Sequence, residues 1–489
     1  MTPEINHTCT EKFRREHSPS MDDIIFTRRD FLMRTGMGFG AMSLASLFGI
    51  NPGDAIGAPV AAAAGPLAVK QPHFAAKAKA VIHIFASGGP SQVDTWDPKP
   101  ELKKYDDKTI PGHDGLAFGS PFEFKKSGKS GTEVSDVFPK LGEVIDDMAI
   151  IRSLWTDIPA HEVAQRFMNT GSLQLPKPSM GSWVVYGLGS ENQNMPGFIT
   201  MGGAPDWRQS SFLPGIFQGC NVNYNTRMDL DDVIMNIKNQ FTPMERQRRE
   251  LDLVKQLNEM HKEKLQKDAQ LEARIESFEM AFKMQTEATD AFDITKESEA
   301  TRALYGVGAT GMGMGNVSEV GAKLLVARRL VERGVRFVQV EVGGWDTHQN
   351  LATALRTSAT NVDGPAAALI KDLKQRGLLD STLIIWGGEF GRTIYSQGGL
   401  SKANYGRDHH PRCFTMWMAG GGTKGGTIHG ETDDFSYNIV KDPVHIRDFH
   451  ATVLHLLGFE HERFSFKYQG LDQKLTGVEP ARIVKEILM

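Results

Sequence analysis

Short apolar runs, rich in β-branched residues, alternate with helical patterns along most of the chain. The runs cover residues 80–85, 148–151, 335–340, 383–386 and 413–418, and most of them lead into a pair or triplet of glycines. Apolar runs that stop at glycine are typical of interior strands. Strands that alternate with helices predict an α/β fold with a doubly wound, mostly parallel sheet.

One predicted helix spans residues 322–333, where leucine and valine side chains fall on one face. Gly334 follows at the position where a helix commonly ends. Residues 230–299 are different, because they are charged, rich in methionine and nearly free of glycine and proline. We interpret 226–318 as a helical insertion into an α/β domain that spans 78–489. The run of charges is typical of a solvated helix face.

The N-terminal segment carries an export pattern. Arg28 and Arg29 precede Phe31 and Leu32, a short glycine-rich apolar stretch and an alanine-rich run. This order resembles a twin-arginine signal, and the alternative is a basic amphipathic helix. The apolar stretch falls short of the ~20 residues that a membrane span needs. Residues 1–64 are therefore expected to be signal and linker. The mature protein is expected to reach the periplasm or cell envelope through the twin-arginine export machinery, with no membrane span.

Composition narrows the class of protein. Lysine and arginine total 55 and aspartate and glutamate total 59, so the net charge of −4 offers no basic surplus for a nucleic-acid-binding protein. Hydrophobic residues make up 40% of the chain, which is a globular composition. The three cysteines cannot form a disulfide framework, and no pair of them has zinc-ribbon spacing.

Metal-competent side chains follow the predicted strands. Asp346 and His348 come after the third strand, Glu389 comes after the fourth, and His409 and His410 come shortly before the fifth. In open α/β sheets, ligands bind beyond the carboxyl ends of the strands. Carboxylate and imidazole mixtures suit zinc, manganese or iron, whereas calcium prefers oxygen alone. In an extended backbone Asp346 and His348 point the same way and His409 and His410 point oppositely. A single histidine at a strand end is more often structural, but three such clusters predict a metal site.

Another candidate is His161. The sequence places Asp157 as the cap of a helix that has Pro159 in its first turn, and His161 then lies near the N-terminus of that helix. Backbone N–H groups at this point favour an anion. The alternative is a plain capped helix.

Four motifs carry a resemblance to a known family. They are GGPSQVDTWDPK at 88–99, GWDTH at 344–348, GEFGRT at 388–393 and GRDHHP at 406–411. With these motifs, the chain from Lys79 to about Lys474 resembles the domain-of-unknown-function 1501 family. Members of that family are exported, sulfatase-like proteins that look like relatives of the alkaline phosphatase superfamily. The resemblance implies an alkaline phosphatase- or sulfatase-like α/β fold.

The superfamily resemblance also implies a hydrolase of phosphate or sulfate esters that uses two metal ions. Asp346 and His348 match the Asp/His loop of the superfamily, Glu389 matches a ligand after a later strand, and His409 or His410 matches a late histidine. Two cations would polarise the ester oxygen and activate a water or a nucleophile. The expected cofactor is a divalent metal, zinc or manganese, as one or two ions.

Two departures from the superfamily pattern bear on the chemistry. The early strand ends without its usual aspartate, so Asp94 and Asp97 are the nearest carboxylates and Asp94 is the candidate ligand. Sulfatases carry Cys or Ser nine residues before a Thr-Gly pair, whereas here His161 stands nine residues before Thr170. A formylglycine sulfatase is therefore not expected. His161 is either a metal ligand, which is the preferred interpretation, or a nucleophile, because imidazole can act as a covalent catalyst.

Two cationic side chains are candidates for holding an anionic substrate. Arg392, in the Glu389 loop, could clamp the anion with two parallel hydrogen bonds, and the alternative is a surface ion pair. Lys99 is a weaker candidate, because Asp-Pro-Lys is also a plain turn.

These residues lead to two main hypotheses. The first is an exported metal-dependent hydrolase of small anionic esters or envelope glycans, with His161 and Arg392 in catalytic roles. The second is a non-catalytic, metal-binding envelope protein descended from such hydrolases, which the missing aspartate and the missing Cys or Ser nucleophile motivate. The sequence leaves open a third, in which the same metals remove ester groups from carbohydrate.

Overall fold

The computed structural model describes residues 66–112, 115–174, 177–225, 242–262, 278–284, 290–308 and 317–489. The expected signal and linker, residues 1–64, lie outside these ranges. Within the described ranges, no helix combines the length and the apolar character that crossing a bilayer requires.

The centre of the molecule is a nine-stranded sheet. Its strands are β1 (Ala80–Phe85), β6 (Met148–Trp155), β7 (Phe198–Met201), β8 (Cys220–Asn221), β9 (Phe337–Glu341), β10 (Thr382–Gly387), β13 (Phe414–Ala419), β14 (Thr427–His429) and β17 (Val444–His445). Their order is β14-β6-β13-β10-β1-β9-β7-β8, and β17 pairs with β6. Every pair is parallel except the two that β13 makes with β10 and β6. The predicted α/β fold with a mostly parallel sheet is therefore confirmed.

All five strands predicted from the apolar runs are present, with ends that differ by a few residues. β1 has the predicted bounds, and it pairs with β9 and β10 so that His83 lies between Gln339 and Ile385. The fifth run forms β13, whose antiparallel direction the pattern of apolar residues could not indicate. A run buried on both faces has the same composition in either direction.

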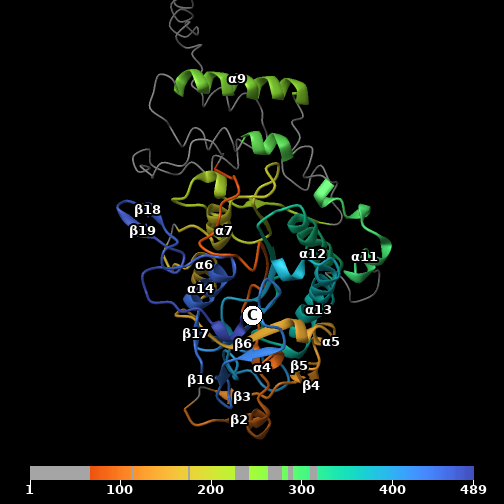
Figure 1. The fold of residues 1–489 in the computed structure, drawn as a ribbon. Coiled ribbons are helices and arrows are strands. Elements are labelled where there is room, and N and C mark those ends of the chain that lie inside the picture. The colour runs from red at the N-terminus through yellow and green to blue at the C-terminus, as the bar shows by residue number, and fades with distance from the viewer. Residues whose placement is uncertain are drawn as a thin grey trace, which may run out of the picture.

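Helices cover both faces of the sheet (Figure 1). One face carries α6 (His161–Thr170), α7 (Met180–Leu188) and α14 (Ile446–Leu456), and the other carries α5 (Pro139–Gly142), α12 (Val317–Glu332) and α13 (Leu351–Gln375). Alternation along β1 supplies both cores, because Ile82 and Ile84 pack on the α12 side while Val81 and Phe85 pack on the α7 side. Burying a side chain of this size contributes roughly 1.5–3 kcal/mol. The predicted helix at 322–333 lies largely within α12.

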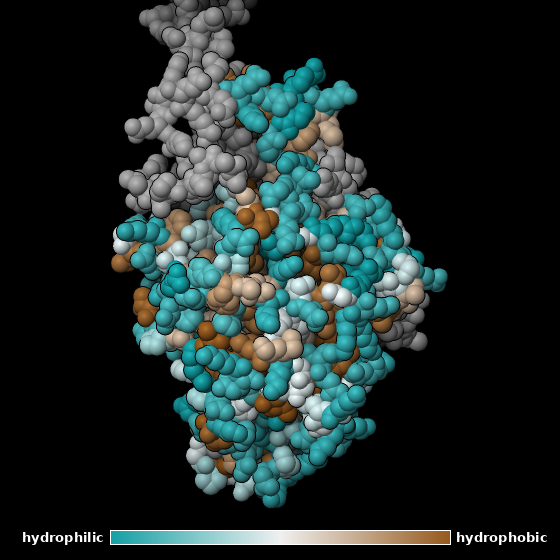
Figure 2. Space-filling view, in the orientation of Figure 1, coloured by the Kyte–Doolittle hydropathy of each residue, from teal (hydrophilic) through white to brown (hydrophobic). Residues whose placement is uncertain are grey.

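Smaller elements lie outside the central sheet. The short helix α4 (Gln92–Thr95) follows β1, and five hairpins pair β2 (Lys108–Thr109) with β3 (Leu116–Ala117), β4 (Phe124–Ser127) with β5 (Thr132–Ser135), β11 (Gly391–Arg392) with β12 (His409–His410), β15 (Glu431–Thr432) with β16 (Ile439–Lys441), and β18 (Phe466–Tyr468) with β19 (Leu471–Gln473). The surface seen in Figure 2 is mostly hydrophilic, with apolar residues in small, separated patches.

The described parts of the expected insertion are helical. They include α9 (Met244–Lys262) and α11 (Glu299–Leu304), and α9 lies far from the β2–β5 hairpins in Figure 1. Buried ion pairs hold the C-terminal part of the expected insertion against the helices of the α/β domain. Glu297 forms one of them with Arg328 of α12, at 2.8 Å. Arg328 also contacts Asp372 of α13 at 2.9 Å, and its side chain is fully buried. These pairs tie the segment before α11 to the two long helices behind the sheet.

Candidate metal centre

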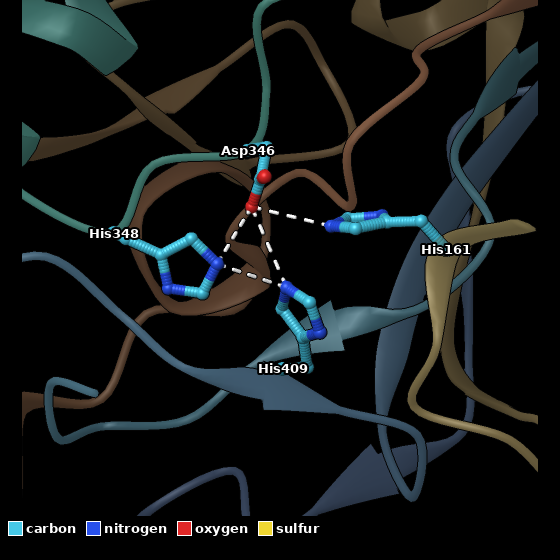
Figure 3. A group of neighbouring side chains, drawn as sticks. All are labelled: His161, Asp346, His348 and His409. Carbon is cyan, nitrogen blue, oxygen red and sulfur yellow. Dashed lines mark hydrogen bonds and ion pairs between the residues drawn. The ribbon is translucent and has the colours of Figure 1, made fainter.

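Four side chains from three separate segments meet at the carboxyl edge of the sheet. His161 opens α6, Asp346 and His348 lie in the loop after β9, and His409 lies in β12. In Figure 3, Asp346 stands at the centre and the three imidazole rings surround its carboxylate. The sequence separates these residues by as many as 248 positions, and the sheet brings them together.

One atom of Asp346 is the meeting point of the group. Its Oδ1 is 2.9 Å from His348 Nε2, 3.2 Å from His161 Nε2 and 3.4 Å from His409 Nε2. The Nε2 atoms of His348 and His409 are 3.0 Å apart. One ligand atom from each residue lies within 4.8 Å of all the others, and among the described residues no second group of three or more His, Cys, Asp or Glu converges in this way.

His161 has its position because α6 begins there. Ala160 is extended, at φ −108° and ψ 124°, and no side chain caps the helix. The expectation that Asp157 caps it is wrong, because the carboxylate of Asp157 instead lies 3.1 Å from His445 Nε2. The helix ends at Gly171, where φ is +66° and an added Cβ would lie 1.8 Å from the Leu475 carbonyl oxygen. Glycine is therefore required at the end of the helix that presents His161.

Asp346 and His348 reach the same point because they are two residues apart in an extended loop. The prediction that their side chains point the same way is confirmed by the 2.9 Å contact between them. Trp345 anchors the loop in the core at 2% exposure. Gly344 turns the loop with φ +95°, and its carbonyl oxygen accepts a 2.6 Å hydrogen bond from Ser358 of α13.

His409 and His410 point in opposite directions, as their spacing predicted. In the hairpin of β11 and β12, His409 pairs with Arg392 and faces the group around Asp346. His410, expected as a metal ligand, lies outside the group because its Nε2 is 2.9 Å from the Tyr437 carbonyl oxygen. Strand alternation sends one ring to each side, so only one of the two histidines can join the cluster.

Hydrogen bonds behind the group orient two of the three rings. Glu389 Oε1 lies 2.6 Å from His161 Nδ1, and Glu389 itself is fully buried and held by the backbone N–H of Gly88 at 3.0 Å. Gln165 Nε2 donates to the same oxygen at 3.0 Å. Sequence reasoning missed Gln165, although its place four residues after His161 puts both on one face of α6. Glu389, expected as a ligand, thus lies behind His161.

His409 is oriented in the same way, because its Nδ1 lies 2.8 Å from the Pro159 carbonyl oxygen. His348 differs from the other two histidines, since its Nδ1 is buried and has no hydrogen-bond partner in the part of the chain that the structure describes. A ring whose Nδ1–H is held by an oxygen presents Nε2 as the free lone pair. Two of the three imidazoles are therefore prepared to coordinate through Nε2.

Arg392 is buried, and its donors are already taken. Its Nε donates to the Gly89 carbonyl at 2.9 Å, Nη1 donates to the Arg407 carbonyl at 3.1 Å, and Nη2 donates to Asp346 Oδ1 at 2.6 Å and to the Gly88 carbonyl. The second Nη1 donor faces the ring of His348. The expected clamp for a substrate anion is therefore engaged with the protein, and Arg392 holds the carboxylate of Asp346 in place.

Asp94 does not lie in the group where it was expected. Its side chain is fully buried and forms a two-point ion pair with Arg407, with Oδ1 3.0 Å from Nη2 and Oδ2 against Nε. Ser91 adds a 2.5 Å hydrogen bond to Oδ2. Both oxygens of Asp94 are occupied by these partners, which gives the residue a structural place. Lys99 also lies elsewhere, because its Nζ is 3.0 Å from Asp97.

The charges of the group favour ligand-competent protonation states of Asp346, His348 and His409, but not of His161. Burial lowers the pKa values of His348 and His409, and the positive charge of Arg392 lowers them further, so both rings are neutral at pH 7. Burial opposes ionisation of Asp346, but the hydrogen bond from Arg392 outweighs it and lowers the pKa of that carboxyl to about 2. For His161, burial is outweighed by the hydrogen bond and charge of Glu389, which raise its pKa.

The donor set fits a divalent transition metal. Three imidazole nitrogens and one carboxylate oxygen are ligands that zinc takes in a tetrahedral arrangement, and manganese accepts the same atoms. His161 Nε2 is buried and makes no hydrogen bond to any described residue, although it faces the centre of the group. A buried nitrogen in this state is costly unless it binds something. Asp346 is 46% exposed, so the group is reached from solvent.

Comparisons with known proteins find one protein family and several solved structures of low sequence identity. A family model described as "Protein of unknown function (DUF1501)" matches residues 78–488, and no curated protein matches the chain. The chain is similar to the PsFucS1 sulfatase from Pseudoalteromonas sp., at 13% identity and a TM-score of 0.34. The match covers 79% of this chain and 68% of the sulfatase. The chain is also similar to an alkaline phosphatase from the Antarctic bacterium TAB5, at 9% identity and a TM-score of 0.30, in a match that covers 71% of this chain and 92% of the phosphatase. A third similar structure is a protein in the alkaline phosphatase superfamily from Vibrio parahaemolyticus, at 11% identity and a TM-score of 0.34. That match covers 86% of this chain and 73% of the other protein.

Proposed function

The chain belongs to the DUF1501 family, whose model spans residues 78–488, and from that premise we propose that it is an exported, metal-dependent hydrolase of phosphate or sulfate esters. The observation that carries this proposal is the convergence of three imidazole Nε2 atoms and Asp346 Oδ1 within 4.8 Å. The proposed ligands are His161, Asp346, His348 and His409. The proposed cofactor is one zinc or manganese ion.

The proposal of one ion rather than two rests on the ligands that the molecule offers. Asp94, the candidate for the missing early aspartate, is neutralised by Arg407 in the buried interior. Glu389 is engaged by the Gly88 N–H and by His161. With both carboxylates occupied, the four residues around Asp346 Oδ1 make one complete ligand set.

A cation at the site would attract an anionic substrate. A divalent cation and the guanidinium of Arg392 together would bring three positive charges, and Asp346, Glu389 and the nearby Asp408 bring three negative ones. The neutral rings of His348 and His409 add none. The positive charge would be concentrated on the metal ion, which would attract a phosphate or sulfate ester, and the exposed side of Asp346 is where the ester would approach.

Each residue has a distinct part in the proposed reaction. The chemistry that a bound divalent cation supplies is polarisation of the ester oxygen and a lowered pKa of coordinated water. Glu389 orients His161 through Nδ1, as carboxylates behind metal-bound histidines do. Arg392 holds Asp346 and limits the net negative charge of the ligand set. We assign His161 to metal binding rather than to nucleophilic attack, because its Nε2 faces Asp346 Oδ1.

The proposal is tested by metal analysis combined with a panel of aryl phosphates and aryl sulfates. The full chain is expected to hold one metal ion and to turn over an aryl ester, and chelation is expected to abolish the turnover. Asp346→Asn is expected to lose both the metal and the activity. Asp380→Asn changes an exposed carboxylate that precedes β10, at the other end of that strand from the Glu389 loop, and serves as the matched control. A metal-free wild-type protein that still turns over the ester would overturn the proposal.

A second candidate function follows from Arg392. Since all of its donors are engaged within the protein, none is left to grip a substrate anion. This favours a metal-binding envelope protein without turnover, for which the metal orders the loops at the sheet edge. Stoichiometric metal with no turnover on the ester panel, together with a large loss of thermal stability on chelation, would select this candidate over the hydrolase.

A further inference from the structure

A second cluster of charged side chains lies around Asp97, away from the proposed metal ligands. Asp97 is 2% exposed and receives hydrogen bonds from the hydroxyl groups of Thr432 at 2.5 Å and Ser436 at 3.0 Å. Lys99 Nζ lies 3.0 Å from Asp97 Oδ1 and donates to the Thr432 carbonyl at 3.3 Å. The lysine side chain is 10% exposed, so its charge is almost entirely enclosed.

Arg152 brings a second buried cation to this cluster. It lies in β6, its side chain is 16% exposed, and its Nε is 3.9 Å from Asp97 Oδ1. That distance is too long for a hydrogen bond. Its Nε and Nη2 are buried and have no hydrogen-bond partner among the described residues. Buried guanidinium donors normally have acceptors, so these two require an explanation.

Thr415, on the neighbouring strand β13, also has a buried donor without a hydrogen-bond partner among the described residues. The register of β13 against β6 shifts between Phe414 and Met416, which places Thr415 at an irregularity beside the middle of β6. Alternation along the two strands puts Thr415 and Arg152 on the same face of the sheet. The Thr415 hydroxyl is buried and also lacks a partner within the described ranges of the chain. The two strands therefore present unpaired donors at neighbouring positions on one face of the sheet.

The buried charges of this cluster do not cancel. Lys99 and Arg152 face one buried carboxylate, that of Asp97. Glu133 and Glu431 also act on the charge of Arg152, but both are exposed, and Glu431 is paired with Lys441 at 2.8 Å. Buried cations therefore outnumber buried carboxylates here, and three buried donor atoms have no partner among the described residues.

We propose that Arg152, Lys99 and Thr415 form a binding site for a small inorganic oxyanion of the sulfate or phosphate class, separate from the metal centre. The planar fork of Arg152 matches two oxygens of such an anion, and Thr415 supplies a third donor. The anion balances the surplus charge beside Asp97. This site does not depend on the proposed hydrolytic function, because none of its three residues lies among the proposed metal ligands.

The site is tested by calorimetric titration of the full chain with sodium sulfate and with sodium phosphate, at constant ionic strength. Saturable binding of one anion per chain is expected, and it is expected to persist after chelation of metal. Arg152→Met is expected to weaken the affinity at least tenfold. Arg412→Met is the matched control, because Arg412 is exposed and lies two residues before β13, and it is expected to bind as the wild type does.

Lys99→Met and Thr415→Val keep the test open if Arg152→Met does not fold, and each is expected to weaken binding severalfold. Wild-type affinity in these variants, or no saturable binding by the folded wild type, would overturn the proposal. Binding that disappears on chelation would also overturn it, because the anion would then sit on the metal. Tighter binding of chloride than of sulfate or phosphate would exclude the oxyanion class. Ester turnover is not measured in this experiment, so its result stands apart from that of the proposed function.

Discussion

The buried ion pair of Asp94 and Arg407 offers the sharpest separation of a structural role from a ligand role. Both side chains are fully buried, and both carboxylate oxygens contact the guanidinium. Asp94→Leu removes the negative charge and leaves the charge of Arg407 unpaired in the interior. Breaking a buried pair in this way costs about 3–5 kcal/mol of unfolding free energy.

The magnitude can be separated from ordinary packing losses by a double-mutant cycle. Arg407→Met alone is expected to cost a similar amount, because it leaves the carboxylate of Asp94 buried with Ser91 as its remaining partner. The double variant Asp94→Leu with Arg407→Met removes both charges. Its cost is expected to fall well below the sum of the two single costs, since apolar replacement of a whole buried pair is often close to neutral.

The assay is urea unfolding of the four proteins, with the metal content of each measured by mass spectrometry. We expect metal stoichiometry to be the same in all of them, because Asp94 lies outside the group around Asp346. The reasoning is refuted if Asp94→Leu loses its metal while its unfolding free energy stays at the wild-type value. That result would return Asp94 to the role of a ligand.

Three further predictions concern stability, the metal and export. Burial lowers the pKa of His450 to about 4, so the stability that its neutral ring contributes is complete above the unfolded pKa near 6.5 and is lost as the pH falls toward 4, roughly 3 kcal/mol in all. In urea titrations between pH 4 and 8, the unfolding free energy of His450→Leu should depend less steeply on pH than that of the wild type. An unchanged pH dependence would contradict this. Glu389→Gln should weaken metal affinity about 10–100-fold, because it removes the charge behind His161, and competition with a chromophoric chelator measures it; equal affinity would mean that Glu389 is only structural. Replacing Arg28 and Arg29 by lysine should retain the protein in the cytoplasm, and cell fractionation with immunoblotting would expose the error if the variant were still exported.

The strands could be predicted because their information is local. A run such as residues 80–85 is apolar at every position, and it forms β1 with both faces buried. The direction of β13 could not be predicted in the same way, since it depends on which neighbours the strand meets. Composition was enough to predict helices in residues 230–299, where α9 lies, and that this segment is an insertion stays a prediction. The burial of Arg328 between Glu297 and Asp372, in contrast, depends on contacts distant in sequence.

The candidate site shows the same division. Strand-end position and alternation were enough to bring Asp346, His348 and His409 forward, and they predicted that His410 would diverge from His409. The sequence could not say which of the two histidines would face the group. It also could not show that Asp94 would meet Arg407, a partner 313 positions away.

The role of Arg392 could not be predicted from the sequence either, because it depends on contacts with residues distant in the chain. Its place in the loop after β10 suggested a clamp for an anion, but the carbonyl groups of Gly88 and Gly89 fold back onto the guanidinium. Those carbonyls lie about 300 positions earlier in the chain. A motif therefore located the residue, and only the packed loops revealed that its donors are engaged.

X-ray absorption spectroscopy of the metal-loaded full chain tests the central claim most directly, because it reports the number and type of ligand atoms around the ion. With one zinc ion per chain, we predict a first shell of three imidazole nitrogens and at least one oxygen at about 2.0–2.1 Å. His409→Ala should lower the imidazole count by one. A first shell without imidazole nitrogen, or a second metal ion close to the first, would contradict a single ion held by His161, Asp346, His348 and His409.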